Sequence, residues 1–322
     1  MSTRKIMVIG GAVADVSLCP VDSTVFERSS TSLDTIPLQP GGDAMNEASV
    51  LARLGNDVSL CTLLGKDAVG TLLLHTLEAR HIGVEHVIQR DDISSSINVV
   101  LVSADGERRF VTSSQSALRR LSLEHILPMV SSLSSSCLVS FASLFVSPAL
   151  DIADMTTLFK TLKDKGCHLC ADMTRAKKGE KVRDLMELLP YIDELFANYD
   201  EGALLTDADT PEEIVDAFLS HGARQVILKL GSKGCLYASQ AHRLAMPAYS
   251  HAHVIDTTGA GDTFAACYIH ALMQNMPLKE RIAFATAGAS VCIEHIGHAP
   301  EALNFTMLQK RTIEILSSCP SE

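Results

Sequence analysis

The chain has 322 residues, 47% hydrophobic and 20% charged, a globular composition large enough for one sizeable core. Its formal net charge of -11 argues against a nucleic-acid or anionic-membrane partner, which would require a basic surface. No apolar run has the length of a signal peptide or a membrane span, and the nine scattered cysteines read as reduced thiols, so we expect a cytoplasmic protein.

Strand-like and helix-like segments alternate along most of the chain. Apolar runs predict strands at 5–9, 58–64, 137–140, 168–171, 194–197 and 225–230, and helical spacing predicts helices at 45–54, 72–79, 158–165, 182–189 and 212–221. Such alternation favours βαβ units, and right-handed crossovers would give a doubly wound, mostly parallel sheet flanked by helices.

Two segments interrupt this alternation. Residues 22–40 look β-like, and residues 93–114 resemble a hairpin turning at Asp105-Gly106. We therefore expect one α/β domain over residues 1–322, with a small β-sheet lid formed by about 17–40 and 93–114. The unpaired edges of such a lid predict pairing with a second copy of the chain, hence a homodimer.

The stretch "VIDTTGAGDTF", residues 254–264, combines two glycines and two carboxylates at the start of a helical pattern. The turn at Gly259, Ala260 and Gly261 predicts a helix N-terminus with free backbone N–H groups, which favours an anion. Asp262 has two interpretations there, a helix cap or a general base beside a phosphoryl group. Neighbouring glycines favour the base, because a cap needs no anion site next to it.

Other phosphate-binding signatures do not match. Lys66 follows Gly65, but Asp67 stands where a P-loop has Ser or Thr, and only Gly10-Gly11 follows the first strand. The missing GxGxxG disfavours a dinucleotide-dependent oxidoreductase, and no protein-kinase signature set is present.

"DTTGAGDTF" and an earlier stretch, "GGDAMNEASVLARLG" at residues 41–55, resemble the two signatures of the ribokinase-like (PfkB) carbohydrate kinases. "GKDAVG", "ANYDE" and "LKLGSKG" extend the resemblance over nearly the whole chain, and the YdjH-type sugar kinases look most similar. The resemblance implies a ribokinase-like fold and ATP-dependent phosphorylation of a sugar hydroxyl, with Mg²⁺.

The resemblance also implies roles at the second signature. Asp262 matches the catalytic base, and the N–H groups of Gly259, Ala260 and Gly261 match the anion hole. Asp256 and Thr258 lie where many members bind a monovalent cation such as K⁺.

On the nucleotide side, Asn198 and Glu201 match an Asn-x-x-Glu element that orders metal-bound water and phosphate, with Glu201 acting on Mg²⁺ through water. The same pair could instead cap a surface helix. The remaining positions that match nucleotide contacts are Lys229, Gly231, Gly234, Thr286 and Gly288; several members have Asn where this chain has Thr286.

On the sugar side, the resemblance implies contacts from Asp15, Gly42, Asp43 and Asn46. We expect Asp15 just past the first strand, at the edge where open α/β sheets bind ligands. Asn98 and Arg109 are either lid contacts or ordinary exposed hairpin positions.

One departure from the family concerns specificity. Residues 140–145, "SFASLF", contain no acid where ribokinase has a substrate carboxylate, which argues against plain ribose. The pair Arg108-Arg109 would suit an acidic or phosphorylated sugar, or could form a solvated lid edge. A nucleoside kinase and a non-catalytic sugar or nucleotide sensor remain the alternatives, and the sequence identifies neither the sugar nor its reacting hydroxyl.

Overall fold

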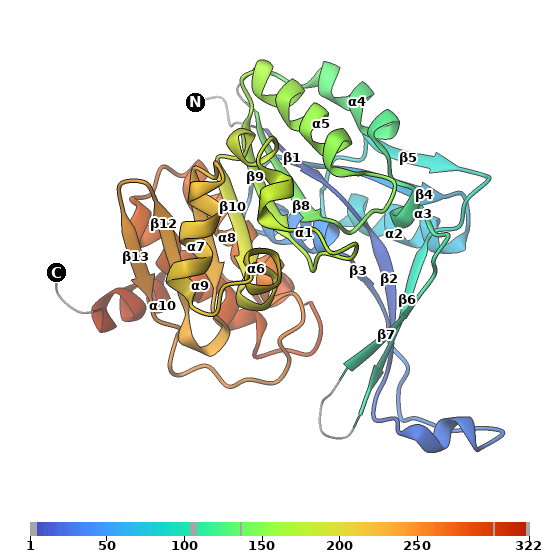
Figure 1. Cartoon of the computed structure of the whole chain (residues 1–322). Coiled ribbons are helices and arrows are strands. Elements are labelled where there is room, and N and C mark those ends of the chain that lie inside the picture. The colour runs from blue at the N-terminus through green and yellow to red at the C-terminus, as the bar shows by residue number, and fades with distance from the viewer. Residues whose placement is uncertain (1–4, 104–107, 136, 299, 320–322) are drawn as a thin grey trace.

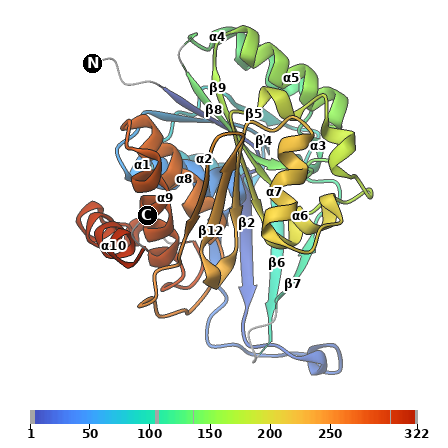
Figure 2. The ribbon, with the colours of Figure 1, turned by 60° about the vertical axis from the view of Figure 1, so that its left-hand side comes forward.

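The structure, a computed structural model, describes residues 5–103, 108–135, 137–298 and 300–319 (Figure 1). Its largest feature is a nine-stranded sheet in the order β13-β12-β11-β10-β9-β8-β1-β4-β5, with helices on both faces (Figure 2). A second sheet, of four strands in the order β3-β2-β6-β7, extends away from this body. The expected α/β architecture with a separate small sheet is confirmed.

The strands of the large sheet are parallel except at one edge. The parallel strands are β1 (Ile6–Ile9), β4 (Val58–Gly65), β5 (Val87–Arg90), β8 (Leu138–Leu144), β9 (His168–Met173), β10 (Glu194–Asn198) and β11 (Gln225–Lys229). The antiparallel edge consists of β12 (Cys235–Ser239) and β13 (Arg243–Met246). All parallel strands end at the same edge, so side chains that follow them converge there.

Each face of the large sheet carries its own core. Ile6 and Val8 pack on one face and Met7 and Ile9 on the other, as strand alternation requires. The first face is covered by α1 (Asp43–Arg53), α2 (Ala68–Ala79), α8 (Ala260–Met273), α9 (Leu278–Cys292) and α10 (Phe305–Ser318). The second is covered by α3 (Ala117–Arg120), α4 (Leu123–Ser132), α5 (Ile152–Asp164), α6 (Tyr199–Thr206) and α7 (Pro211–Ser220).

The expectation of one helix over residues 182–189 is wrong. Two short 3₁₀ turns occupy this region, Val182–Leu185 and Leu189–Tyr191. Pro190 explains the break, because proline has no N–H to donate and disfavours the helical conformation for the residue before it.

The small sheet consists of β2 (Val13–Leu18), β3 (Leu38–Gly41), β6 (Ser96–Val102) and β7 (Arg108–Thr112). The predicted β6–β7 hairpin is confirmed, and its Asp105-Gly106 turn lies outside the described residues. The prediction that residues 22–40 are β-like is wrong for most of that segment, which holds a 3₁₀ turn at Ser23–Phe26 and reaches β structure at Leu38. Strand β2, directly after Gly10-Gly11, was not predicted.

Candidate active site

The predicted anion-binding turn opens helix α8. Gly259, the N-cap, is left-handed with φ of 72°, a conformation that favours glycine. The Ala260 N–H donates to the Thr257 carbonyl at 3.3 Å, whereas the N–H groups of Gly259 and Gly261 donate to no described residue. Two backbone donors and the positive end of a 14-residue helix therefore face the same space.

Asp256 connects this turn to the loop that follows α9. Its carboxylate accepts the Thr258 N–H at 2.8 Å and the Gly297 N–H at 2.7 Å. The side chain is buried, and its position is fixed by backbone groups on both sides. Asp256 therefore stabilises the loop beside the anion-binding turn.

Asp262 lies in the first turn of α8 and faces α1. Asn46 of α1 donates from its side-chain amide to the Asp262 carboxylate at 2.8 Å. Burial raises the pKa of Asp262 well above its ordinary value, the neighbouring Asp43 carboxylate raises it further, and Asn46 opposes the shift. The surroundings of Asp262 therefore raise the affinity of its carboxylate for a proton.

A buried ion pair lies beside the turn. Lys229, at the end of β11, donates to Asp172, at the end of β9, at 2.6 Å. A side chain added at Gly261 would come within 3.3 Å of the Lys229 ammonium, so this charge borders the anion-binding turn. Burial by itself would lower the pKa of Lys229, but Asp172 and Glu201 outweigh it and the net shift is upward. Lys229 therefore stays cationic.

Asn198 and Glu201 form the helix cap considered from the sequence. The Asn198 side chain accepts the Glu201 N–H and the Glu201 carboxylate accepts the Asn198 N–H, both at 2.9 Å, at the start of α6. One Glu201 oxygen takes no part in the cap, and burial raises the pKa of this carboxyl to about 7. The cap leaves Glu201 with an oxygen for a further partner.

Three of the other proposed nucleotide contacts, Gly234, Thr286 and Gly288, have evident structural roles. Gly234, with φ of 92°, passes so close to the Met246 carbonyl that a side chain would overlap it, whereas Gly231 borders open space. Thr286 donates to the Ile282 carbonyl within α9 at 2.9 Å. Gly288 lets α9 approach Cys267 of α8.

The sugar-side residues come from both sheets. Asp15 lies within β2 rather than just past the first strand, and Asn98 of β6 donates to it at 2.9 Å. A side chain at Gly41 would displace the Asp15 carboxylate from its present position. Gly42 has a φ of 91°, and a side chain there would clash with the Gly11 carbonyl. Asp43, first residue of α1, accepts a hydrogen bond from Ser143 at the end of β8.

Arg109 is not brought together with these residues. In the small sheet Asp15 is opposite Asn98, and Asn98 is opposite Thr112. Arg109 is opposite Leu101, which lies an odd number of positions along β6 from Asn98. Strand alternation therefore puts Arg109 on the face of the sheet opposite Asn98 and Asp15. Its side chain is exposed on that face.

Sequence reasoning missed four residues that the fold brings here. Asp172 directly follows a predicted strand, a signal that could have found it, and Ser143 lies in the stretch noted for lacking an acid. Glu47 belongs to the first signature; burial raises its pKa to about 8. His298 packs against Gly259 with both ring nitrogens buried and without a hydrogen-bond partner among the described residues. Nothing in the sequence indicated His298.

Comparison with known proteins supports the same assignment. Residues 3–303 match the family described as pfkB family carbohydrate kinase. The chain belongs to this family. The expected enzyme class, an ATP-dependent carbohydrate kinase, is thereby confirmed at the level of the family.

The relatives of this carbohydrate kinase include ribokinases. The ribokinase of Schizosaccharomyces pombe is 27% identical over 92% of this chain and 93% of its own length. Ribokinase of Arabidopsis thaliana, solved with ribose and ATP, has a TM-score of 0.77 at 24% identity over 97% of this chain and 99% of that one. An E. coli protein provisionally assigned as ribokinase II, solved with ATP and Mg²⁺, has a TM-score of 0.81 at 19% identity, with 97% and 99% coverage. These two structures share the fold of the kinase.

Within the described part of the kinase, no helix combines the length and the apolar character needed to cross a membrane.

Proposed function

We propose that this protein is an ATP-dependent sugar kinase that transfers the γ-phosphoryl group of ATP to a hydroxyl of a monosaccharide or sugar derivative. The observation that carries the proposal is the arrangement around Asp262. A carboxylate oriented by Asn46 adjoins two unengaged backbone N–H groups and the buried cation of Lys229. A base, an anion site and a positive charge are the main needs of phosphoryl transfer.

In this mechanism Asp262 accepts the proton of the attacking hydroxyl. The N–H groups of Gly259 and Gly261 hold the transferring phosphoryl oxygens, Ala260, whose own N–H is bonded to the Thr257 carbonyl, completes the turn between them, and Lys229 neutralises part of the charge that develops on these oxygens. Gly231, Gly234, Thr286 and Gly288 belong to the nucleotide side by family resemblance. The close packing at two of these glycines is compatible with that placement. Gly234 passes close to the Met246 carbonyl, and Gly288 lets α9 approach Cys267 of α8.

The residues present fit a magnesium ion. Glu201 keeps one carboxylate oxygen outside the cap, and Mg²⁺ is commonly held through few carboxylates and several waters. When bound, the ion would neutralise phosphate charge. A divalent charge held by Glu201 would also favour the ionised form of that carboxyl, whose pKa is raised in the free protein. For a monovalent cation such as K⁺ we propose the Asp256–Thr258 turn.

Asp15, Gly42, Asp43, Asn46 and Asn98 would bind the sugar, with the small sheet acting as a lid. Relatives named ribokinase, 2-dehydro-3-deoxygluconokinase and ATP-dependent 6-phosphofructokinase, at 24–27% identity, support a sugar or sugar derivative without selecting one. Within the family, we propose that this chain belongs with the YdjH-type sugar kinases, on the resemblance of its first signature. A nucleoside kinase is the second candidate, supported by the shared fold of aminoimidazole riboside kinase from Salmonella enterica, with a TM-score of 0.78 at 20% identity.

We also propose a cytoplasmic homodimer that buries the outer face of the small sheet. The register puts apolar side chains on the face opposite Asp15, namely Val16, Leu38, Ile97, Val99, Leu101 and Val111. Leu38 is 50% exposed and Val111 58% exposed. These apolar side chains, with the exposed Arg109 on the same face, are typical of an interaction surface, and a twofold copy of the sheet would cover them.

The test is ADP release with Mg-ATP across ketoses, aldoses, sugar acids, sugar phosphates and nucleosides, with Asp262→Asn beside the wild type. A substrate whose turnover disappears in the variant establishes the kinase and its substrate class. If nucleotide binds and no compound is turned over, the sensor alternative replaces the proposal.

A further inference from the structure

We propose that Cys137 and Cys167 form a modification site, at which a low-molecular-weight disulfide oxidises the two thiols to a reversible disulfide bond within the chain. The inference is independent of the proposed kinase function. Both cysteines are free thiols in the structure, and they lie 30 positions apart in the sequence, so only the fold brings them together. Disulfides of proteins in a reducing compartment are usually of this reversible kind.

The register of two neighbouring strands puts the cysteines side by side. Cys137 directly precedes β8, and Cys167 directly precedes β9. The first residues of these strands, Leu138 and His168, are paired in the parallel ladder, and the His168 N–H donates to the Cys137 carbonyl at 3.0 Å. Neighbouring strands lie about 4.7–4.9 Å apart, and the Cα atoms of a disulfide lie about 4.4–6.8 Å apart. The backbone therefore already has a separation that a disulfide allows.

The two side chains lie on the same face of the large sheet. Both pack in the core that α4 and α5 cover, and their sulfur atoms are 2.7 Å apart. Unbonded carbon atoms pack at about 3.5–4.0 Å and sulfur is larger than carbon, so no other atom can lie between these thiols. A disulfide needs only a further approach of the sulfurs to about 2.05 Å, without rearrangement of either strand.

The two thiols differ in their readiness to react. The hydrogen bond shared with Cys137 lowers the pKa of Cys167, Lys165 and Lys163 lower it further, and burial opposes the shift. The same hydrogen bond and burial raise the pKa of Cys137. Because the thiolate is the nucleophile in thiol–disulfide exchange, Cys167 is the attacking sulfur.

Oxidation takes two exchange steps. The Cys167 thiolate attacks one sulfur of the reagent RSSR, forms a mixed disulfide and releases RS⁻, which takes up the proton that Cys167 gave to water. The Cys137 sulfur then attacks the Cys167 sulfur and releases the second RS⁻, which takes up the Cys137 proton. Two protein thiols and one RSSR thus become one protein disulfide and two RSH, and an excess of thiol reverses the reaction.

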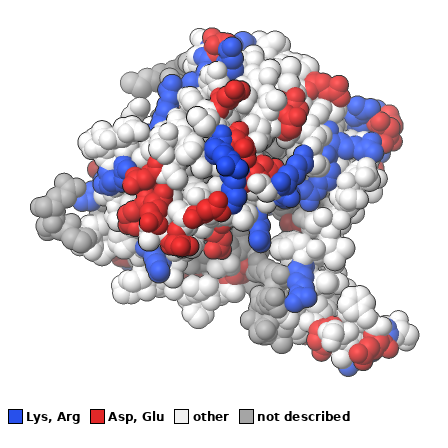
Figure 3. Space-filling view, in the orientation of Figure 1, with Lys and Arg blue, Asp and Glu red and all other residues white. Residues whose placement is uncertain are grey.

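The sulfurs are buried but lie directly beneath two short loops. Cys137 and Cys167 are 2% and 1% exposed, whereas Ser134, Ser135 and Gly166, in the loops before them, are exposed. A local opening of these loops, far smaller than unfolding of the domain, would give the reagent access. Acidic and basic side chains are mixed on the surface over α4 and α5 (Figure 3), so its charge excludes neither an anionic nor a neutral reagent.

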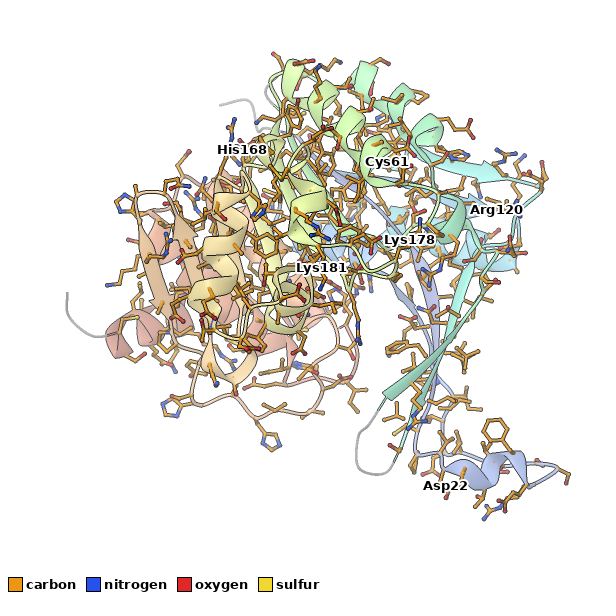
Figure 4. The ribbon with its side chains drawn as sticks, in the orientation of Figure 1. Asp22, Cys61, Arg120, His168, Lys178 and Lys181 are labelled. Carbon is orange, nitrogen blue, oxygen red and sulfur yellow. The ribbon has the colours of Figure 1, made fainter. Side chains whose placement is uncertain are left out.

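The site lies at the edge of the large sheet where the parallel strands begin. Figure 4 labels His168, which follows Cys167, at this edge, whereas Lys178 and Lys181, after β9, lie toward the other end of the strands. The disulfide would therefore form away from Asp262 and its neighbours. It would close a loop that contains β8 and α5, and this constraint on the unfolded chain should stabilise the folded protein.

The experiment treats the folded, fully reduced protein with glutathione disulfide, then alkylates the remaining thiols in denaturant and measures masses. We expect two fewer alkylated cysteines than in the reduced protein, and a tryptic product in which residues 121–160 are joined to residues 166–175. Dithiothreitol should reverse both changes. The oxidised protein should have a Tm about 5 °C above that of the reduced protein.

Cys170→Ala is the matched control. Cys170 is on the same tryptic peptide as Cys167 but packs on the opposite face of the sheet, so this variant should form the same cross-link. In Cys137→Ala the reaction should stop at a mixed disulfide of Cys167 with glutathione, without a cross-link and without the rise in Tm.

Three results overturn the inference: no cross-link in the wild type, a cross-link that Cys170→Ala abolishes, or a cross-linked protein with a lower Tm than the reduced one. The last would mean that the bond forms only by distorting the fold. The wild-type cross-link decides the inference even if a variant folds poorly. None of these measurements involves ATP or a sugar, so the kinase proposal is tested separately.

Discussion

Gly288 offers a test of whether a residue matched to nucleotide binding acts through ATP or through helix packing. A methyl group placed on it in Gly288→Ala would lie 2.3 Å from the Cys267 sulfur and 3.1 Å from the Cys267 Cβ. Cys267 is fully buried in α8, so little room exists for it to move away. Overpacking of this kind costs about 1–3 kcal/mol, and replacing glycine by alanine in a helix returns at most about 1 kcal/mol. We expect a net loss of about 1–2 kcal/mol in the free energy of unfolding.

The assay is urea unfolding of the four proteins of a double-mutant cycle, with Cys267→Ala as the second change. Removing the sulfur leaves a space that the new methyl group fills, so Gly288→Ala should cost little stability in the Cys267→Ala background. The interaction energy between the two changes should therefore be about 1–2 kcal/mol. The KM for ATP of the double variant should match that of Cys267→Ala. Equal cost of Gly288→Ala in both backgrounds would refute the packing argument, and a raised KM for ATP in both would assign Gly288 to the nucleotide.

Three further outcomes are expected. Asp262→Asn should fold and bind ATP normally but lower kcat by about 10²–10⁴, measured by ADP release; near wild-type turnover would remove Asp262 from the base role. The pKa of Glu47 is about 4.5 in the unfolded chain and about 8 in the folded protein. Between these pH values only the folded state keeps the proton, so the free energy of unfolding should fall as the pH rises from about 4.5 to about 8. Glu47→Gln should flatten that slope in urea titrations at several pH values, and an unchanged slope would contradict the assignment. Val111→Asp should yield monomers by light scattering where the wild type is dimeric; a wild type that is monomeric at micromolar concentration would exclude the dimer.

The sequence was most informative where the chemistry is local. The turn at Gly259, Ala260 and Gly261 could be predicted because glycines and a following helical pattern determine its geometry within a few residues. The parallel sheet was predictable for a similar reason, since each buried strand is a continuous apolar run. Asn198 and Glu201 show the limit of predicting function from a local pattern. A helix cap and a water-mediated contact to Mg²⁺ use the same two residues, and the structure contains the cap.

Contacts between distant segments could not be predicted in this way. Asp172 matters because β9 lies near β11 and meets Lys229, a pairing that no local pattern contains. The face on which Arg109 lies depends on strand register, and a shift of one residue would reverse it. Strand β2 was missed because its residues are half-buried on one sheet and lack the continuous apolar character of the central strands.

The hydrogen bond between Asn46 and Asp262 joins residues 216 positions apart and thereby affects how the protein becomes active during synthesis. At about 5–20 residues per second, a ribosome needs roughly 10–40 s to add the second partner after the first. A nascent chain in that interval can form the first strands and α1, yet it lacks Asp262, the proposed base, and the turn at Gly259, Ala260 and Gly261, the proposed anion site. Consumption of ATP can begin only after the last third of the chain has been made and has docked on the first third. Turnover is consequently a stringent reporter of complete folding, since a chain that misfolds at either end is silent.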